Sequence, residues 1–192
     1  AAVFVVRQRD LKRMLAYSGI AQMGYVAIGL ATFDGKAFEG ILVFLAGYLA
    51  TNVAAFLAVA ALSNGEKEPH PLADLAGLGR RRPFAATVLT LAMLSLTGLP
   101  PTVGFIGKLL VFRAAVDAGL ITLALVGIFG SLVSAGYYLR VVYYLWMKEP
   151  IREVAAAEED VLSGAAYILV SAAMLVLGVL PRPLLDMARA AV

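Results

Sequence analysis

Four long stretches without a charged residue constrain the fold of this chain more than any other feature. Residues 15–33, 40–62, 118–139 and 161–180 contain no Asp, Glu, Lys or Arg. A helix needs about 20 apolar residues to cross a bilayer core, and each stretch has about that length. Only 15% of the 192 residues are charged and 61% are hydrophobic, whereas a soluble chain is about 25% charged. The sequence predicts an all-α, polytopic transmembrane helix bundle.

Turn residues and interfacial aromatic residues set the predicted limits of these crossings. Residues 1–6 are apolar but too short to span, and we predict that they end a preceding transmembrane helix of a longer chain. Residues 7–14 hold four basic residues and are predicted to form a cytoplasmic loop. Residues 15–192 are predicted to form the transmembrane bundle. Its uninterrupted crossings are expected at 15–33, 37–62, 118–147 and 161–180.

A fifth apolar segment, residues 84–117, does not fit one ordinary helix. A continuous helix of this length would measure about 51 Å, whereas two separate crossings would reach only about 23 Å each. Proline and glycine residues interrupt it at Gly98, Pro100, Pro101, Gly104 and Gly107. We therefore predict one crossing made of two half-helices, broken near 99–104. Irregular backbone at membrane depth must be buried in protein or face a watery cavity, so the break predicts a functional interior.

The distribution of basic residues predicts which loops face the cytoplasm. With a single crossing at 84–117, ten basic residues in loops share one side and three lie opposite, which places the ten in the cytoplasm. If residues 84–117 formed two crossings, Lys148 and Arg152 would change sides of the membrane with Arg182 and Arg189. The count of basic residues would again be ten against three. The prediction of one broken crossing therefore depends on helix length and not on charge.

Lys108 is the strongest candidate for chemistry because it is the only lysine well inside a predicted crossing. It precedes Asp117 by nine residues, which is about 13 Å along a helix. An ammonium at the bilayer centre costs at least about 2.5 to 3.5 kcal/mol, and such residues usually mark ion or proton routes. A lysine removed from water in this way can exchange protons, so we predict a proton relay at Lys108. Snorkelling of the side chain toward the headgroups is the competing interpretation.

Other polar side chains in the crossings suggest a pathway less strongly. Tyr48, Thr51 and Asn52 lie within about one helical turn of each other and can hold water or reach Lys108. Tyr137 is a further candidate in the crossing 118–147. Ordinary hydrogen bonds between helices, or packing in the case of the tyrosine, are the alternative for each of them.

The composition excludes several kinds of chemistry. The chain has no cysteine and one histidine, so disulfides, thiolate metal sites, cysteine nucleophiles and histidine clusters are ruled out. No phosphate-binding loop or zinc-ligand spacing is present. The net charge of +3 is what basic loops on one side of a membrane produce, and we expect no nucleic-acid partner. We predict neither a metal nor a cofactor in this chain.

Four motifs resemble a known family. They are DLKRMLAYS at 10–18 followed by QMGY at 22–25, LAGYL at 45–49, MLSLTGLPPTVGFIGK at 93–108, and YYLRV at 137–141. Together they are similar to the antiporter-like subunits of respiratory complex I, an NADH:quinone oxidoreductase, and most of all to its N-type subunits. This family is related to the Mrp-type antiporter subunits. The resemblance covers essentially the whole chain.

The resemblance implies a specific place for this chain in the family fold. Members have fourteen helices in two inverted repeats, each with a discontinuous helix and a buried charged residue at the break. The chain would then run from the end of helix nine through helix fourteen, with 84–117 as the broken helix twelve. The family's proton-relay lysine falls on Lys108. The partners of that lysine in the other repeat would lie upstream of these residues.

We therefore expect a proton-translocating subunit of a bacterial complex I in the inner membrane, with no redox chemistry of its own. The expected partners are the lipid bilayer and other membrane subunits, including other antiporter-like subunits. Flavin, iron–sulfur clusters and quinone are expected in other subunits. An Mrp-type cation/proton antiporter subunit is the alternative, and a structural spacer whose lysine never titrates is a third interpretation.

Overall fold

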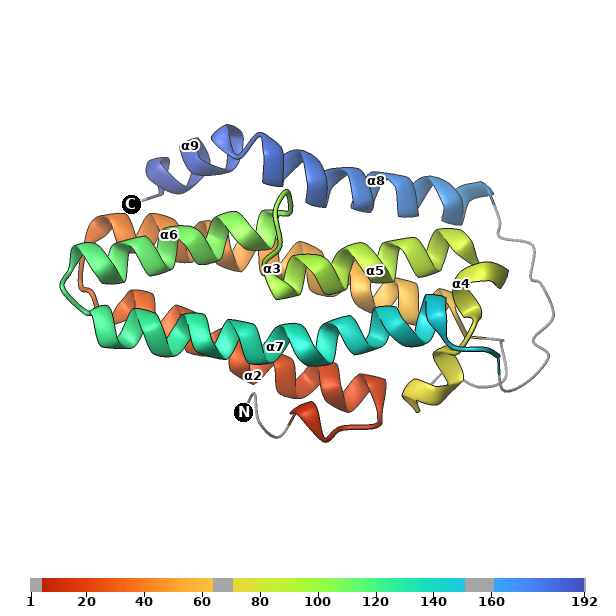
Figure 1. Cartoon of the computed structure of the whole chain (residues 1–192). Coiled ribbons are helices and arrows are strands. Elements are labelled where there is room, and N and C mark those ends of the chain that lie inside the picture. The colour runs from red at the N-terminus through yellow and green to blue at the C-terminus, as the bar shows by residue number, and fades with distance from the viewer. Residues whose placement is uncertain (1–4, 64–70, 151–160, 192) are drawn as a thin grey trace.

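The structure is a computed structural model that describes residues 5–63, 71–150 and 161–191, and these parts of the chain fold as helices (Figure 1). The predicted all-α transmembrane bundle is confirmed. Three short elements, η1 (Leu72–Leu75), α4 (Leu78–Arg81) and α9 (Arg182–Ala190), were not predicted. The long helices are α2 (Leu11–Leu30), α3 (Gly35–Ala61), α5 (Pro83–Thr97), α6 (Val103–Asp117), α7 (Ile121–Met147) and α8 (Val161–Val179).

Capping residues decide where several helices begin. The Asp10 carboxylate accepts a hydrogen bond from the Arg13 backbone N–H at 2.8 Å, so α2 starts at Leu11. This corrects the predicted loop 7–14, whose last four residues are helical. Asp34 caps α3 in the same way through the Lys36 N–H. Pro83 opens α5 in the first turn, where a missing N–H costs nothing.

Within the described part of the chain, two helices, α3 and α7, are long and apolar enough to cross a membrane by length and composition. A third span results if α8 and α9, which are bent by 78° relative to each other, are counted as one broken helix. Helix α2 is less apolar because it carries Lys12, Arg13, Ser18 and Gln22. Helices α5 and α6 have 15 residues each, which is too short for a separate crossing. The five crossings and their orientation remain predictions.

Helices α5 and α6 occupy the middle of the bundle (Figure 1). Helix α3 packs along both of them, α7 and α8 contact both, and α2 packs against α3, α6 and α7. One apolar cluster surrounds α5 and includes Met14, Leu89, Met93 and Tyr138. A second cluster lies beside α6 and includes Tyr25, Phe44 and Val111. The two half-helices are thus enclosed by the remaining long helices.

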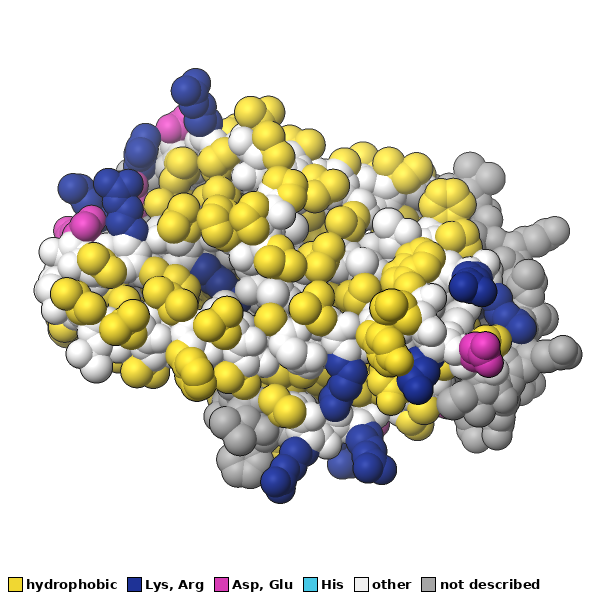
Figure 2. All heavy atoms as spheres, in the orientation of Figure 1, with side chains coloured by type: hydrophobic (Ala, Val, Ile, Leu, Met, Phe, Trp, Pro, Cys, Tyr) yellow, Lys and Arg dark blue, Asp and Glu magenta, His cyan; other side chains and the backbone are white. Residues whose placement is uncertain are grey.

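The outer surface of the bundle is apolar. Hydrophobic side chains cover the middle of the face in Figure 2, and most charged side chains lie toward its margins. Large apolar residues of α7 and α8 are exposed, among them Phe129, Leu132 and Leu169. Exposed apolar surface of this extent is typical of contact with lipid or with other membrane subunits.

Candidate functional site

The connection between α5 and α6 begins with a glycine turn. Gly98 has φ +86° and ψ +43°, a left-handed conformation that favours glycine. Its N–H donates to the Ser95 carbonyl at 3.0 Å, and the Leu99 N–H donates to the Leu94 carbonyl at 3.1 Å. These two bonds form a Schellman motif and occupy two of the last four carbonyls of α5. The carbonyls of Leu96 and Thr97 accept no hydrogen bond from a backbone N–H at this turn.

Glycines in α6 let the second half-helix approach its neighbours closely. A Cβ atom at Gly104 would overlap the Ser95 backbone oxygen of α5. A Cβ atom at Gly107 would lie 2.6 Å from the Cα of Phe44 in α3. Between the half-helices, the Pro100–Pro101 peptide bond is cis. The predicted break residues therefore lie close together, and the first turn of α6 lies beside the last turn of α5.

Lys108 reaches back from α6 to the free carbonyls at the end of α5. Its Nζ donates hydrogen bonds to the Leu96 oxygen at 2.7 Å, to the Thr97 oxygen at 3.0 Å and to Ser131 Oγ of α7 at 3.2 Å. The residue is 4% exposed. An ammonium has three N–H donors, and here each has one acceptor. Within these helices the side chain does not snorkel outward.

Two further contacts offset the cost of burying the ammonium. The carbonyl end of a helix carries partial negative charge, and the amine lies at that end of α5. The Tyr25 ring of α2 also lies beside the amine, with 4.8 Å between Nζ and the ring centroid. This is within the range of a cation–π interaction. Among the residues that the structure describes, no carboxylate forms an ion pair with Lys108.

Gln22 of α2 links the site to α7. Its Nε2 donates to the Leu96 carbonyl at 3.0 Å and to the Tyr138 hydroxyl at 3.1 Å. The Leu96 oxygen therefore accepts hydrogen bonds from both Lys108 and Gln22. Gln22 and Tyr138 are both buried. The carbonyl that binds the amine is thus fixed from two sides.

A second buried contact joins α3 to the break. Thr51 Oγ1 lies 2.9 Å from Ser95 Oγ, and Ser95 Oγ accepts the Gly104 N–H at 3.3 Å. The three residues belong to α3, α5 and α6. Thr51 therefore stabilises the packing of the half-helices and does not contact the amine.

In the described part of the chain, the other residues of the predicted pathway form no hydrogen bond or ring contact with Lys108. Asn52 Nδ2 donates to the Tyr48 carbonyl of its own helix at 3.2 Å. The Tyr48 ring stacks on Phe44, with 6.2 Å between ring centroids. The Tyr137 ring packs against Tyr138, and its hydroxyl is buried without a hydrogen-bond partner. The structure thus brings Lys108 to the break, while Tyr48, Asn52 and Tyr137 form contacts of their own.

Sequence reasoning did not identify the side chains that surround the amine. Gln22 and Tyr25 occur in one of the family-like motifs, but nothing in the sequence assigns them a role at Lys108. Ser131 gives no signal, because a single serine in an apolar helix is ordinary. These partners become visible only when α2 and α7 are packed against the break.

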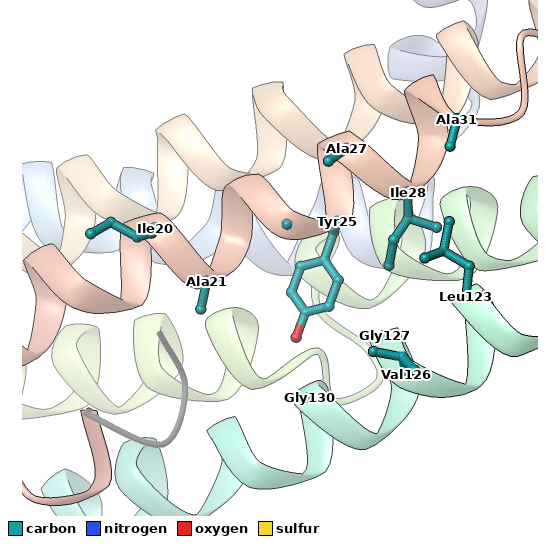
Figure 3. A pocket seen from close by; sticks show the side chains of 11 residues that line it. Ile20, Ala21, Tyr25, Ala27, Ile28, Ala31, Leu123, Val126, Gly127 and Gly130 are labelled. Carbon is teal, nitrogen blue, oxygen red and sulfur yellow. The ribbon is translucent and has the colours of Figure 1, made fainter.

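A groove between α2 and α7 runs past the Tyr25 side chain (Figure 3). Its volume is about 520 Å³, and its lining is mostly apolar. Gly24, Gly127 and Gly130 leave the groove open, while Ile20 and Val126 line its sides. Figure 3 shows the Tyr25 hydroxyl directed toward α7 near Gly130. The groove therefore passes the tyrosine that lies beside Lys108.

Comparison with known proteins places this architecture in a family. The model of the family described as "NADH:quinone oxidoreductase/Mrp antiporter, TM" matches residues 1–134, more than half of the chain. The chain belongs to this family. The resemblance predicted from the motifs is thereby confirmed.

Curated members of the NADH:quinone oxidoreductase/Mrp antiporter family with similar sequences are called subunit N. The NADH-quinone oxidoreductase subunit N of Geobacter metallireducens is 45% identical over 184 residues, which are 95% of this chain and 39% of that protein. The subunit N of Salinispora arenicola is 41% identical, over 99% of this chain and 37% of that protein. The chain thus spans about two fifths of the length of these relatives.

Solved structures of the family share the helix arrangement. A chain of respiratory complex I from Thermus thermophilus with bound aureothin has a TM-score of 0.77 and 35% identity, covering 96% of this chain and 42% of that chain. A chain of the Mrp complex from Dietzia sp. DQ12-45-1b has a TM-score of 0.86 at 22% identity, covering 99% and 43%. The second likeness concerns the fold alone. Both neighbours are chains of multi-subunit membrane complexes.

Proposed function

We propose that this chain is part of a proton-translocating membrane subunit of an NADH:quinone oxidoreductase, and that Lys108 takes up and releases the proton. The observation that carries the proposal is the buried amine between two half-helices, with three acceptors and no paired carboxylate in the described residues. Family membership and relatives at up to 45% identity support it.

The chemistry assigned to this chain is proton transfer alone. The amine rests on two carbonyls that can bind an ammonium but supply no proton of their own. Release of the proton weakens those hydrogen bonds, because a neutral amine is a poorer donor than an ammonium. Flavin, iron–sulfur clusters and quinone are assigned to other subunits, where the redox reaction would supply the driving force.

The surroundings of the chain follow from the same proposal. The exposed apolar residues of α7 and α8 suit lipid and neighbouring membrane subunits, including other antiporter-like subunits. The bacterial relatives support a location in the bacterial inner membrane. An Mrp-type cation/proton antiporter subunit is the alternative, and the Mrp chain at 22% identity shares the fold alone. Copurification with flavin and iron–sulfur proteins distinguishes the two.

The test is a Lys108→Ala variant in the full complex in membrane vesicles. The expected result is normal assembly with proton pumping per electron reduced at least about tenfold, because an acid–base group typically contributes about a hundredfold or more. Lys148→Ala, which removes an exposed lysine at the end of α7, is the control and should pump normally. Unchanged pumping per electron in the Lys108 variant would refute the proposal.

A further inference from the structure

The three atoms that contact the Lys108 amine differ in what they can do with a proton. Two are backbone carbonyl oxygens, those of Leu96 and Thr97. An amide oxygen accepts a hydrogen bond but has no proton to pass on. The third is the Ser131 hydroxyl, which can accept one proton while it donates another. Only the serine can therefore conduct a proton away from the amine by direct contact.

The hydrogen bonds of Ser131 fit both charge states of the lysine. With an ammonium present, Ser131 Oγ accepts from Nζ at 3.2 Å and donates its own hydrogen to the Thr97 carbonyl at 3.2 Å. A neutral amine has two N–H donors and one lone pair. Rotation of the serine hydroxyl would then direct its hydrogen to that lone pair. The amine can thus form all its hydrogen bonds in both charge states without movement of the backbone.

A second hydroxyl lies next to the serine. The Tyr25 hydroxyl lies close to Ser131 and Ser134 of α7, and the ring of the same tyrosine lies against the amine. Tyr25 also lines the groove between α2 and α7 (Figure 3). A Cβ atom at Gly130 would meet nothing nearer than the Tyr25 hydroxyl oxygen, at 4.0 Å. The groove is therefore lined by both Gly130 and Tyr25, with room between the glycine and the tyrosine hydroxyl.

We propose that Ser131 is the residue with which Lys108 exchanges its proton, and that Tyr25 is the next hydroxyl toward the groove between α2 and α7. This inference rests on the proposed relay role of Lys108. The Ser131 hydroxyl first rotates its hydrogen from the Thr97 carbonyl toward the Tyr25 oxygen. One N–H bond of the ammonium then breaks as a new O–H bond forms on Ser131, while the original O–H bond of Ser131 breaks and its hydrogen passes to the Tyr25 oxygen. Tyr25 passes its own hydrogen to a water molecule in the groove. One proton moves, no electron is transferred, and both hydroxyls are regenerated by rotation.

The experiment compares Ser131→Ala, Ser131→Thr, Thr87→Ala and Tyr25→Phe in the full complex in membrane vesicles. The readouts are proton pumping per assembled complex and the ratio of pumping rates in H₂O and D₂O. We expect Ser131→Ala and Tyr25→Phe to slow pumping at least about tenfold and to raise the isotope ratio. Ser131→Thr keeps the hydroxyl and should pump near the normal rate. Thr87→Ala removes an exposed hydroxyl of α5 that donates to the Pro83 carbonyl of the same helix at 2.7 Å, takes no part in the site and should pump normally.

Each outcome decides a separate statement. Normal pumping and a normal isotope ratio in Ser131→Ala, together with lost pumping in Lys108→Ala, overturn the serine step and leave the lysine in place. Slow pumping in Ser131→Ala with normal pumping in Tyr25→Phe overturns only the tyrosine step. A lower amount of complex with an unchanged rate and isotope ratio per complex shows a structural role and also overturns the serine step. Normal pumping in Lys108→Ala refutes the proposed function itself.

Discussion

The chain interrupts its helices at two places with different consequences. Between α5 and α6, five residues separate two half-helices, and the interruption encloses a buried lysine. Between α8 and α9, the chain turns by 78° next to the exposed residues Val179 and Leu180. Beyond the second interruption, α9 forms an ion pair with α3 at the surface, with 3.3 Å between Arg189 Nε and Glu39 Oε2. A broken helix alone therefore does not make a site.

What distinguishes the first interruption is the way its free backbone groups are used. The Schellman turn at Gly98 leaves the carbonyls of Leu96 and Thr97 for the amine of Lys108. At the second interruption, the Leu180 N–H continues the helical pattern by donating to the Val176 carbonyl at 2.7 Å. The four predictions below test this contrast.

The largest effect is expected from Gly104→Val in α6. Any Cβ atom at this position overlaps the Ser95 backbone oxygen, so α6 cannot stay beside α5. We expect the free energy of unfolding to fall by at least about 3 kcal/mol, as for severe overpacking of a core. The measurement is the amount of assembled complex in the membrane, which should fall to a small fraction. Gly136→Val, in α7, is the control because a Cβ atom at Gly136 has nothing within 4 Å. Equal amounts of the two variants would contradict the close approach of the half-helices.

Gly98→Ala is expected to affect both stability and pumping. Its φ of +86° disfavours alanine by about 1 to 2 kcal/mol. The new Cβ would also lie 2.9 Å from Cδ of Lys108 and displace the amine. Gly119→Ala is a matched control, because Gly119 has φ +76° with nothing within 4 Å of its Cβ position.

Melting temperature and pumping per electron should be measured for both glycine variants. We expect similar losses of stability in the two and a loss of pumping only in Gly98→Ala. Normal pumping in Gly98→Ala would show that the position of the amine at this turn is unimportant.

Gln22→Leu is expected to have an intermediate effect. It removes the hydrogen bonds to the Leu96 carbonyl and the Tyr138 hydroxyl, both in buried surroundings. We expect the free energy of unfolding to fall by about 1 to 3 kcal/mol, because the Tyr138 hydroxyl is left without this donor. Asn52→Leu is the comparison, because the side chain of Asn52 donates a hydrogen bond to a carbonyl of its own helix. The melting temperature of the purified complex should fall more for Gln22→Leu, and the reverse order would refute this view.

The smallest effect is expected from Arg189→Gln at the second interruption. The Arg189 side chain is 60% exposed and the Glu39 side chain 28% exposed. Such surface ion pairs contribute less than about 1 kcal/mol. Pumping per electron should be unchanged and the melting temperature should shift only slightly. A pumping defect as large as that of Lys108→Ala would remove the distinction between the two interruptions.

Much of the first interruption could be predicted from sequence because its causes are local. Pro100, Pro101 and the neighbouring glycines disfavour a continuous helix wherever they occur. Lys108 stands out because charge is rare in an apolar segment. The last four residues of the predicted loop 7–14 were missed as helix because Lys12 and Arg13 suggest a loop, whereas the Asp10 cap starts α2 there.

The partners of the amine could not be predicted because they are set by packing between distant segments. Gln22 and Leu96 are 74 positions apart, and Lys108 and Ser131 are 23 apart. Thr51 was considered as a partner of Lys108, yet its hydroxyl lies beside Ser95 instead. The direction of each side chain around its helix decides these contacts. That direction depends on how α2, α3 and α7 are rotated against the half-helices.

The acceptors supplied by α5 are main-chain atoms, and this has a consequence for how the site can evolve. The oxygens at positions 96 and 97 remain whichever side chains occur there. Substitutions at these two positions that keep the helix intact can therefore accumulate without removing the lysine's anchor. Genetic selection for proton coupling should fall instead on the residues that shape the turn and bring the amine to it, above all Gly98, Gly104 and Lys108.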